Sequence, residues 1–139
     1  MRVFLDANVL FSAAYRETGS VRTFFALAEA GACELVSSGY AIDEARRNIS
    51  VKHPERSADL ESLLGRIALC REPAPATLAW AAAQRLPSKD APILAAAVDA
   101  RCHLLVTGDR THFGALFGHK LRGTVVMLPV DAIGLLVGG

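Results

Sequence analysis

The chain opens with Arg2-Val-Phe-Leu-Asp6-Ala-Asn8-Val9-Leu10, a short apolar stretch that ends in a carboxylate and an amide. Residues 2–6 have the composition of a strand, and residues 9–15 have the apolar pattern of a helix. An acid that closes a buried first strand enters a medium of low dielectric, where its charge needs a partner or a metal ion. The opening therefore predicts a strand, a functional acid at Asp6 and a helix that follows it closely.

The rest of the chain repeats this alternation of short apolar strands and helices. Such alternation is typical of βαβ units, so we predict a three-layer α/β/α fold with a central parallel sheet of about five strands. The expected strands are residues 2–6, 33–37, about 69–72, 103–107 and 124–128. The expected helices are residues 9–15, 20–30, 40–51, 54–69, 76–85, 91–100 and 113–117. No linker or internal repeat separates them, so residues 1–139 are expected to form a single domain.

The composition narrows the class of protein. With 139 residues, of which 52% are hydrophobic, the chain can bury the core of one domain. The formal net charge of +1 neither favours nor excludes a nucleic-acid partner. The three cysteines form no C-x-x-C pair, which fits reduced thiols better than a disulfide framework or a zinc site. No uncharged apolar run reaches the roughly 18 residues of a membrane span, so we expect a cytoplasmic protein without a membrane partner.

Four acids lie near junctions between the expected strands and helices: Asp6, Glu44, Asp90 and Asp109. In a parallel sheet, ligand sites form beyond the carboxyl ends of the strands, where the strand order reverses, so these acids are expected to converge. Each has a structural alternative when it is taken alone. Asp90 would serve as a helix cap, Glu44 as a solvated helix charge and Asp109 as a turn residue.

A cluster of carboxylates predicts a divalent metal ion. Like charges raise one another's pKa, so several acids remain ionised together only beside a cation. Oxygen ligands suit Mg²⁺ and Mn²⁺, and no His/Cys set in the chain has zinc spacing. Such ions lower the pKa of a bound water and stabilise the charge that develops on a phosphate. The acids therefore favour phosphate chemistry.

The same residues resemble the motifs of PIN-domain nucleases, in order and in approximate spacing, along nearly the whole chain. Leu5-Asp6-Ala-Asn8-Val9-Leu10 is similar to the opening motif of that family, and Asp43-Glu44 to its second acid. The third-acid helix is matched by Lys89-Asp90-Ala-Pro-Ile-Leu-Ala-Ala-Ala97, and the fourth-acid strand and turn by Leu105-Val-Thr107-Gly-Asp109-Arg-Thr-His-Phe113. The resemblance implies a parallel five-stranded sheet and endonucleolytic cleavage of single-stranded RNA by metal-activated water. It further implies the toxin role in a toxin–antitoxin pair, with an antitoxin protein as partner, and a homodimer.

By resemblance and by chemistry together, Asp6, Glu44, Asp90 and Asp109 would hold one or two Mg²⁺ or Mn²⁺ ions. Asp43 stays open as an alternative to Glu44, because the helix boundary is not fixed by the sequence. Asn8 and Thr107 can hydrogen-bond carboxylates, so they are expected to position the acids. Asn8 would serve equally well as the N-cap of the next helix.

The remaining polar residues were assigned by charge and position. With the four site acids set aside, the other charges are clearly net positive. Contacts to RNA phosphates are expected from the basic residues close to a site acid in sequence, namely Arg46, Arg47, Lys89 and Arg110. We interpret Asp99 as a surface charge, because it lies on the face of its helix opposite Asp90. His112 and His119 are left out of the site, because a lone histidine near a turn is more often neither ligand nor catalyst.

Two other functions compete with a nuclease. A phosphatase of the haloacid-dehalogenase kind also uses a strand-terminal Asp, a Ser or Thr, a Lys and a late Gly-Asp, and Asp6, Ser37, Lys89 and Gly108-Asp109 occur in that order. It needs a second acid where this chain has Asn8, and an amide cannot act as the general acid. A PIN-like module that binds RNA or a protein partner without cutting is the second alternative, against which the presence of all four acids argues.

Overall fold

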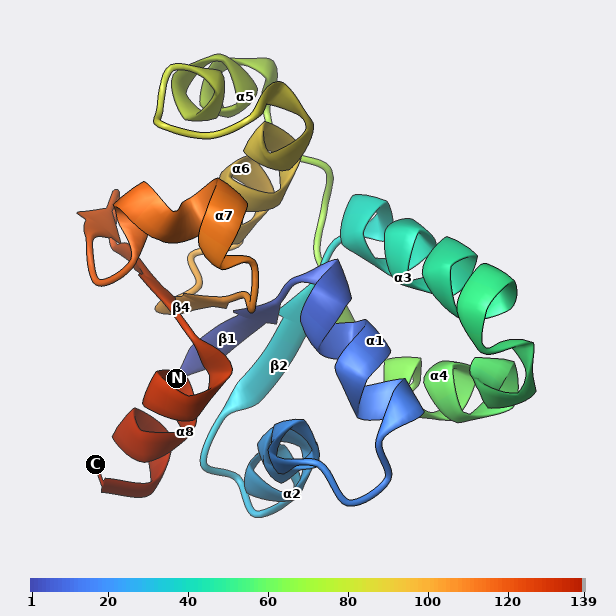
Figure 1. Cartoon of the computed structure of the whole chain (residues 1–139). Helices are drawn as coiled ribbons and strands as arrows, with labels where there is room; N and C mark the ends of the chain where they lie inside the picture. The colour runs from blue at the N-terminus through green and yellow to red at the C-terminus, as the bar shows by residue number, and fades with distance from the viewer. Residues whose placement is uncertain (139) are drawn as a thin grey trace.

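The computed structural model describes residues 1–138, which form a central sheet between two layers of helices (Figure 1). The strands of this part of the chain are β1 (Arg2–Leu5), β2 (Glu34–Ser37), β3 (Ala68–Leu69), β4 (Leu104–Val106), β5 (Lys120–Leu121) and β6 (Thr124–Met127). They lie in the order β3-β2-β1-β4-β6-β5, and all neighbours are parallel except β5 and β6. The predicted three-layer fold with a parallel sheet is confirmed.

The short edge strand β5 is an addition that the sequence analysis did not predict. It joins β6 through Arg122 and Gly123, which both have positive φ, at 49° and 92°. Tight hairpins favour positive φ at both turn residues, and Asn-Gly is their usual signal. The sequence Arg122-Gly123 lacks that signal, because arginine rarely adopts a positive φ. The Arg122 guanidinium lies 4.3 Å from the centre of the Trp80 ring, a cation–π contact that offsets the backbone cost.

The helices divide between the two faces of the sheet. One face packs against α1 (Ala7–Tyr15), α2 (Thr23–Glu29), α3 (Gly39–Lys52), α4 (Ser57–Leu64) and α8 (Pro129–Gly138). The other face packs against α5 (Pro75–Ala82), α6 (Ala91–Asp99) and the short α7 (Arg110–Phe113). None of the helices within residues 1–138 is long and apolar enough to cross a membrane.

Several helix boundaries differ from those expected. The helix expected over residues 54–69 is a 3₁₀ turn at Pro54–Arg56 followed by α4, which ends before Gly65. Glycine has low helix propensity, and the chain then enters β3. The helix expected over 76–85 ends earlier, at Ala82. The short helix expected over 113–117 begins three residues sooner, because Asp109 caps it.

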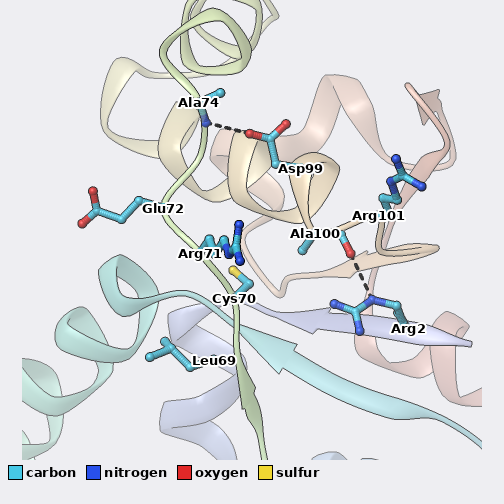
Figure 2. Close-up of a pocket in the computed structure, with 9 residues that line it drawn as sticks. All are labelled: Arg2, Leu69, Cys70, Arg71, Glu72, Ala74, Asp99, Ala100 and Arg101. Carbon is cyan, nitrogen blue, oxygen red and sulfur yellow. Dashed lines mark hydrogen bonds between the residues drawn. The ribbon is translucent and has the colours of Figure 1, made fainter.

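Asp99 is exposed at the surface, as expected, but its carboxylate also binds a neighbouring helix, which the sequence analysis did not predict. Its carboxylate accepts hydrogen bonds from the Ala74 backbone N–H and the Thr77 hydroxyl, each at 2.7 Å (Figure 2). Asp99 therefore supplies, from the end of α6, the cap that α5 lacks in its own sequence. Helix geometry placed the side chain away from Asp90 correctly, but it could not show that α5 packs on that side.

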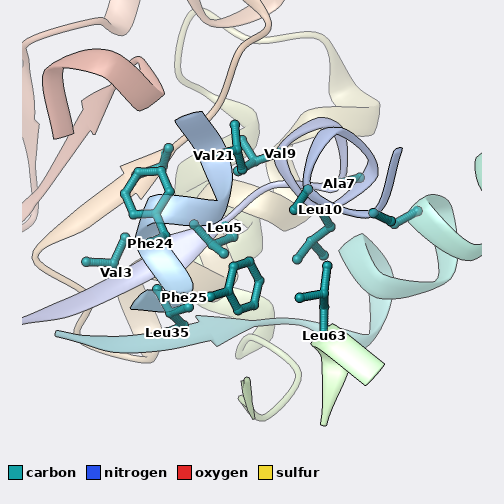
Figure 3. Packing of buried hydrophobic residues seen from close by; sticks show 14 of the residues in the cluster. Val3, Leu5, Ala7, Val9, Leu10, Val21, Phe24, Phe25, Leu35 and Leu63 are labelled. Carbon is teal, nitrogen blue, oxygen red and sulfur yellow. The ribbon is translucent and has the colours of Figure 1, made fainter. Parts of the chain in front are cut away.

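The core follows the alternation of side chains along the strands. Val3 and Leu5 of β1 are fully buried on the α1 side, where they join Leu35, Phe24 and a cluster of apolar helix residues (Figure 3). Phe4 is fully buried on the opposite side, against the alanine-rich α6. Burial on both faces is typical of parallel sheets and fixes the register of β1. As a result, the backbone that follows Leu5 emerges at a defined point of the carboxyl edge.

The strand order reverses between β1 and β4. The chain runs from β1 outward to β2 and β3, and then returns to form β4 on the other side of β1. Loops that leave neighbouring strands in opposite directions open a crevice at their carboxyl ends, and ligands bind there in open α/β sheets. The Asp6 backbone N–H donates to the Val106 carbonyl at 3.0 Å, so the ends of β1 and β4 are joined at this crevice.

Replacing Asp99 with alanine should lower the free energy of unfolding by about 1–2 kcal/mol, because the Ala74 N–H and the Thr77 hydroxyl lose their acceptor. Urea denaturation monitored by circular dichroism measures the change. Glu72→Ala is the control, since Glu72 is exposed and forms no hydrogen bond or ion pair within residues 1–138, and it should stay within about 0.5 kcal/mol of the wild type. Equal effects of the two substitutions would contradict the assigned cap.

Candidate functional site

Asp6 sits at the junction of β1 and α1 and is only 4% exposed. It is the N-cap of α1, and its Oδ1 accepts a hydrogen bond from the Ala7 N–H at 2.7 Å. The second oxygen, Oδ2, faces the end of β4. The sequence leads the strand straight into the helix, so the carboxylate is held at the crevice by the backbone that it caps.

Thr107 connects the ends of β1 and β4. Its fully buried hydroxyl donates to Asp6 Oδ2 at 2.9 Å and accepts from the Asn8 amide at 3.1 Å and the Asp109 N–H at 3.2 Å. The Asn8 amide also lies 3.2 Å from Asp6 Oδ2, and its oxygen accepts from the Gly108 N–H at 2.8 Å. The alternative of Asn8 as an N-cap is therefore wrong, because Asp6 caps α1 and Asn8 bridges to the loop after β4.

Asp90 and Asp109 meet at the crevice together with His112. The Nδ1 of His112 lies 2.8 Å from Asp109 Oδ2 and 3.0 Å from Asp90 Oδ2. One potential ligand atom from each of the three residues falls within 4.8 Å of the other two. Asp90 makes no capping hydrogen bond at the start of α6, so its alternative role as a helix cap is excluded. Asp109 does cap α7 through Oδ1, which accepts from the His112 N–H at 2.9 Å, while Oδ2 remains directed at the cluster.

Two atoms of this cluster are buried without a hydrogen-bond partner in the described part of the chain: Asp90 Oδ2 and His112 Nδ1. The two atoms lie 3.0 Å apart, at the distance of an ion pair, although neither has a hydrogen-bond partner. A buried polar atom without a partner is costly and uncommon in folded proteins. A further group at the crevice, such as a water molecule or an ion, would supply the missing hydrogen-bond partner.

His112 was missed by the sequence analysis. It lies three residues after Asp109, a spacing that places two side chains on one side of a helical turn. That signal depended on a helix beginning at Arg110, whereas the expected helix began at Phe113.

Charge interactions connect the expected acids in a series: Glu44 and Asp90 act on Asp6, and Asp109 acts on Asp90. The pKa of Asp6 is raised to about 6, chiefly by burial and to a smaller extent by the charges of Glu44 and Asp90, while hydrogen bonds from Thr107 and Ala7 oppose the rise. Burial also raises the pKa of Asp90, opposed by the charges of His112 and Lys89 and reinforced by that of Asp109. Asp90 and Asp109 thus come within ligating distance of each other, whereas Asp6 and Glu44 are connected to them by charge and not by membership of that cluster.

The geometry separates Glu44 from Asp43. Glu44 is half-buried on α3 and is the α3 acid whose charge acts on Asp6. Asp43 is exposed, and its carboxylate lies 3.7 Å from the Arg46 guanidinium. The arrangement favours Glu44 as the acid that α3 presents to the crevice.

The basic residues near the acids differ in whether they already form ion pairs within the protein. Arg46 forms two hydrogen bonds of 2.9 Å to Glu61 of α4, so its guanidinium is already engaged. Arg47, Lys89 and Arg110 are exposed, and none of them forms an ion pair within residues 1–138. The sequence around Arg46 does not predict this ion pair, because Glu61 belongs to another helix.

A cavity away from the acid cluster lies near the start of β1. The cavity of about 560 Å³ in Figure 2 is bordered by Arg2 at the start of β1 and by Ala100 and Arg101 just before β4. Of its two acids, Asp99 is hydrogen-bonded to Ala74 and Thr77, and Glu72 is exposed. The cavity is therefore remote from the cluster of carboxylates at the carboxyl ends of the strands.

Comparison with known proteins identifies the family. The family model described as the PIN domain matches residues 2–111, the greater part of the chain. The chain belongs to the PIN domain family. No curated protein matches it significantly in sequence, so further comparison of this PIN domain rests on solved structures.

Three solved structures share the PIN fold at low sequence identity. VapBC2 from Rickettsia felis, bound to a DNA fragment from their promoter, is 16% identical with a TM-score of 0.67, over 92% of this chain and 98% of that one. PAE2754 from Pyrobaculum aerophilum is 17% identical with a TM-score of 0.69, over 100% and 97%. FitAcB from Neisseria gonorrhoeae is 20% identical with a TM-score of 0.60, over 92% and 98%.

The raised pKa of Asp6 predicts how stability depends on pH when no metal is present. A folded-state pKa of about 6, against the ordinary 3.8, means that the folded state binds the proton more tightly than the unfolded state. The contribution of Asp6 to stability is complete below pH 4 and is lost as the pH rises through 6. The loss amounts to about 3 kcal/mol.

The measurement is urea denaturation of the wild type and Asp6→Asn in EDTA between pH 4 and pH 7.5. Asparagine does not titrate, so the stability of the variant relative to the wild type should increase across this range. A difference that stays constant with pH would contradict the assigned burial of the charge.

Proposed function

We propose that this PIN domain is a Mg²⁺- or Mn²⁺-dependent endoribonuclease that cleaves single-stranded RNA. The observation that carries the proposal is the convergence of Asp90, Asp109 and His112 at the switch point of the sheet, with two buried atoms that lack partners. The charges of Glu44 and Asp90 raise the pKa of Asp6, which connects Asp6 and Glu44 to this cluster. Membership of the PIN family, together with the acids in the order of its motif, supports the nuclease reading.

The donor set fits a hard divalent cation. Carboxylate oxygens are the ligands that Mg²⁺ and Mn²⁺ prefer, and a cation would offset the mutual repulsion of the four acids. We assign Asp6, Glu44, Asp90 and Asp109 as the residues that would hold the ion. A bound ion of this kind supplies an activated water and stabilises negative charge on a phosphate.

The protein's own residues would orient this site. Asp6 is fixed by the Thr107 hydroxyl, the Asn8 amide and the Ala7 N–H, so its carboxylate cannot rotate away from the crevice. Asp109 is fixed through Oδ1 by the N–H of His112, which leaves Oδ2 directed at the cluster, 2.8 Å from Nδ1 of His112. We assign Asn8 and Thr107 as positioning residues, and we add His112, whose ring contacts both Asp90 and Asp109.

The RNA backbone would be held by basic side chains around the crevice. Arg47, Lys89 and Arg110 are exposed and free of ion pairs in the described chain, so they can contact phosphates. Arg46 would first have to leave Glu61, which makes it the weakest of the four expected contacts. These contacts supply affinity that depends on salt and not on sequence.

We further propose that the protein is the toxin of a toxin–antitoxin pair, as the sequence resemblance implies. VapBC2 from Rickettsia felis, which shares the fold, binds a DNA fragment from its own promoter. An antitoxin would be the expected partner of this chain, and a homodimer the expected assembly.

The phosphatase alternative does not fit the arrangement. Its required Ser or Thr would be Ser37, but this side chain is fully buried and its hydroxyl donates to the Leu5 carbonyl at 2.8 Å. Asn8, at the position of the phosphatase acid, is engaged in holding Asp6 and Gly108. The family match supports the same conclusion.

Adjacent acids on α3 offer a matched pair of variants. Glu44→Gln should reduce RNA cleavage in Mn²⁺ at least about 100-fold, because a ligand of the ion is lost. Asp43→Asn should retain activity within about threefold, because Asp43 is exposed and faces Arg46. A fluorescently labelled single-stranded RNA, with EDTA as the zero-activity control, measures both rates.

If Asp43→Asn lost cleavage activity and Glu44→Gln retained it, Asp43 would be the metal ligand in place of Glu44. Cleavage that survives complete chelation would exclude the metal-dependent reaction. A wild type that binds RNA and Mn²⁺ but does not cleave would instead support the binding module without activity.

Metal binding can be tested apart from activity through thermal stability. A ligand that binds only the folded state adds about 2.7 kcal/mol at 100 times its Kd, so Mn²⁺ should raise the Tm of the wild type. Asp109→Asn keeps a good helix cap but removes the charge, so its Tm should not respond to Mn²⁺. Differential scanning calorimetry with and without Mn²⁺ gives the comparison, and a normal response of Asp109→Asn would remove Asp109 from the metal site.

A further inference from the structure

A second cavity adjoins the acid cluster on the α1 side of the crevice. It has a volume of about 370 Å³ and is bordered by α1, the 3₁₀ turn at Ser20–Arg22, the loop after β4 and the start of α8. Its lining residues are Asn8, Val9, Ser12, Val21, Gly108, Asp109 and Pro129. Two of them, Asn8 and Asp109, belong to the hydrogen-bonded network around Asp6, so the cavity is continuous with the candidate site.

The chemistry of the lining excludes a phosphate. Asp109 is the charged residue among those that border the cavity, and its negative charge would repel an anion. The other walls are largely apolar, formed by Val9, Val21 and Pro129, of which Val9 and Val21 are buried members of the core cluster in Figure 3. A neutral group with flat apolar faces suits such walls.

One polar group in the cavity is free to recognise a ligand. The side chain of Asn8 is fully used, since its amide donates to Asp6 and Thr107 and its oxygen accepts from Gly108. The hydroxyl of Ser12, in contrast, forms no hydrogen bond with any residue that the structure describes. A hydroxyl both donates and accepts, so it can pair with the edge of a heterocyclic base.

We propose that this cavity binds one nucleobase of the RNA substrate, at a nucleotide that flanks the scissile phosphate, and that Ser12 and Val21 determine which bases are accepted. This inference rests on the proposed nuclease function and names the specificity subsite of the same centre. Single-stranded RNA is read through unstacked bases whose faces pack on side chains and whose edges form hydrogen bonds. The volume lies at the small end of the range of about 300–1,000 Å³ for ligand sites, which suits a single base.

Position supports a base over any other part of the substrate. A phosphate bound through the metal ion that Asp6 and Asp109 would hold places its neighbouring base one sugar away, and the cavity begins at Asp109 itself. The walls come from α1 and from the turn that packs on it, elements whose packing is fixed by the core. The subsite is therefore formed before the substrate arrives.

The test uses a random-sequence single-stranded RNA pool cleaved in Mn²⁺, with the cut sites located by sequencing. The wild type should show a base preference that is concentrated at one of the two positions flanking the cut. Ser12→Ala should weaken that preference about fivefold to tenfold, the effect of one hydrogen bond. Val21→Phe should narrow the cavity and shift the preference toward smaller bases.

Ser62→Ala is the matched control, because Ser62 is an exposed serine inside α4, away from the cavity. It should leave the preference unchanged, and all three variants should keep the wild-type rise in Tm with Mn²⁺. Should Val21→Phe fail to fold, Ser12→Ala decides the question alone.

An unchanged preference in Ser12→Ala and Val21→Phe would overturn the proposal and assign the cavity to another occupant, such as an apolar side chain of a partner protein. A wild type that cuts without any preference at the flanking positions would overturn it as well. Failure of the wild type to cut RNA at all, or to respond to Mn²⁺, would instead refute the nuclease function on which the subsite depends.

Discussion

The carboxylate of Asp6 is buried between the ends of two strands, and the hydroxyl of Thr107 binds it from the neighbouring strand at 2.9 Å. Burial of this charge is unfavourable unless the surroundings compensate it. The compensation comes from Ala7, Asn8 and Thr107, which join the start of α1 to the end of β4. Asp90 and Asp109 meet, because the start of α6 and the loop after β4 bring them within ligating distance of each other.

This arrangement places unfavourable like charges where the fold can tolerate them. The alternating apolar residues of β1 fix its register on both faces, so the strand holds Asp6 in place although its charge is costly. Local conflicts with the rules of stability concentrate at functional sites in folded proteins. The unpartnered atoms of Asp90 and His112 are of the same kind, and they lie beside the acids and away from the apolar core.

The sequence predicted those features that depend on local patterns. Alternating apolar residues located the strands, and Asp6, Asp90 and Asp109 stand where strand–helix junctions predicted them. Features that depend on contacts between distant segments were not accessible: Asp99 caps α5, and Arg46 pairs with Glu61 across two helices. His112 was lost through an error of three residues in a helix boundary, since a four-residue helix carries almost no periodic signal.

The central claim is that one group of carboxylates, contributed by β1, α3, α6 and the loop after β4, holds a divalent ion. Anomalous X-ray diffraction from a crystal soaked in Mn²⁺ tests it most directly, because the metal is located independently of activity. We expect an anomalous peak in contact with Asp6, Asp90 and Asp109, with Glu44 facing it directly or through water. A crystal soaked at saturating Mn²⁺ without a peak at these residues, or with its peak elsewhere on the protein, would contradict the claim.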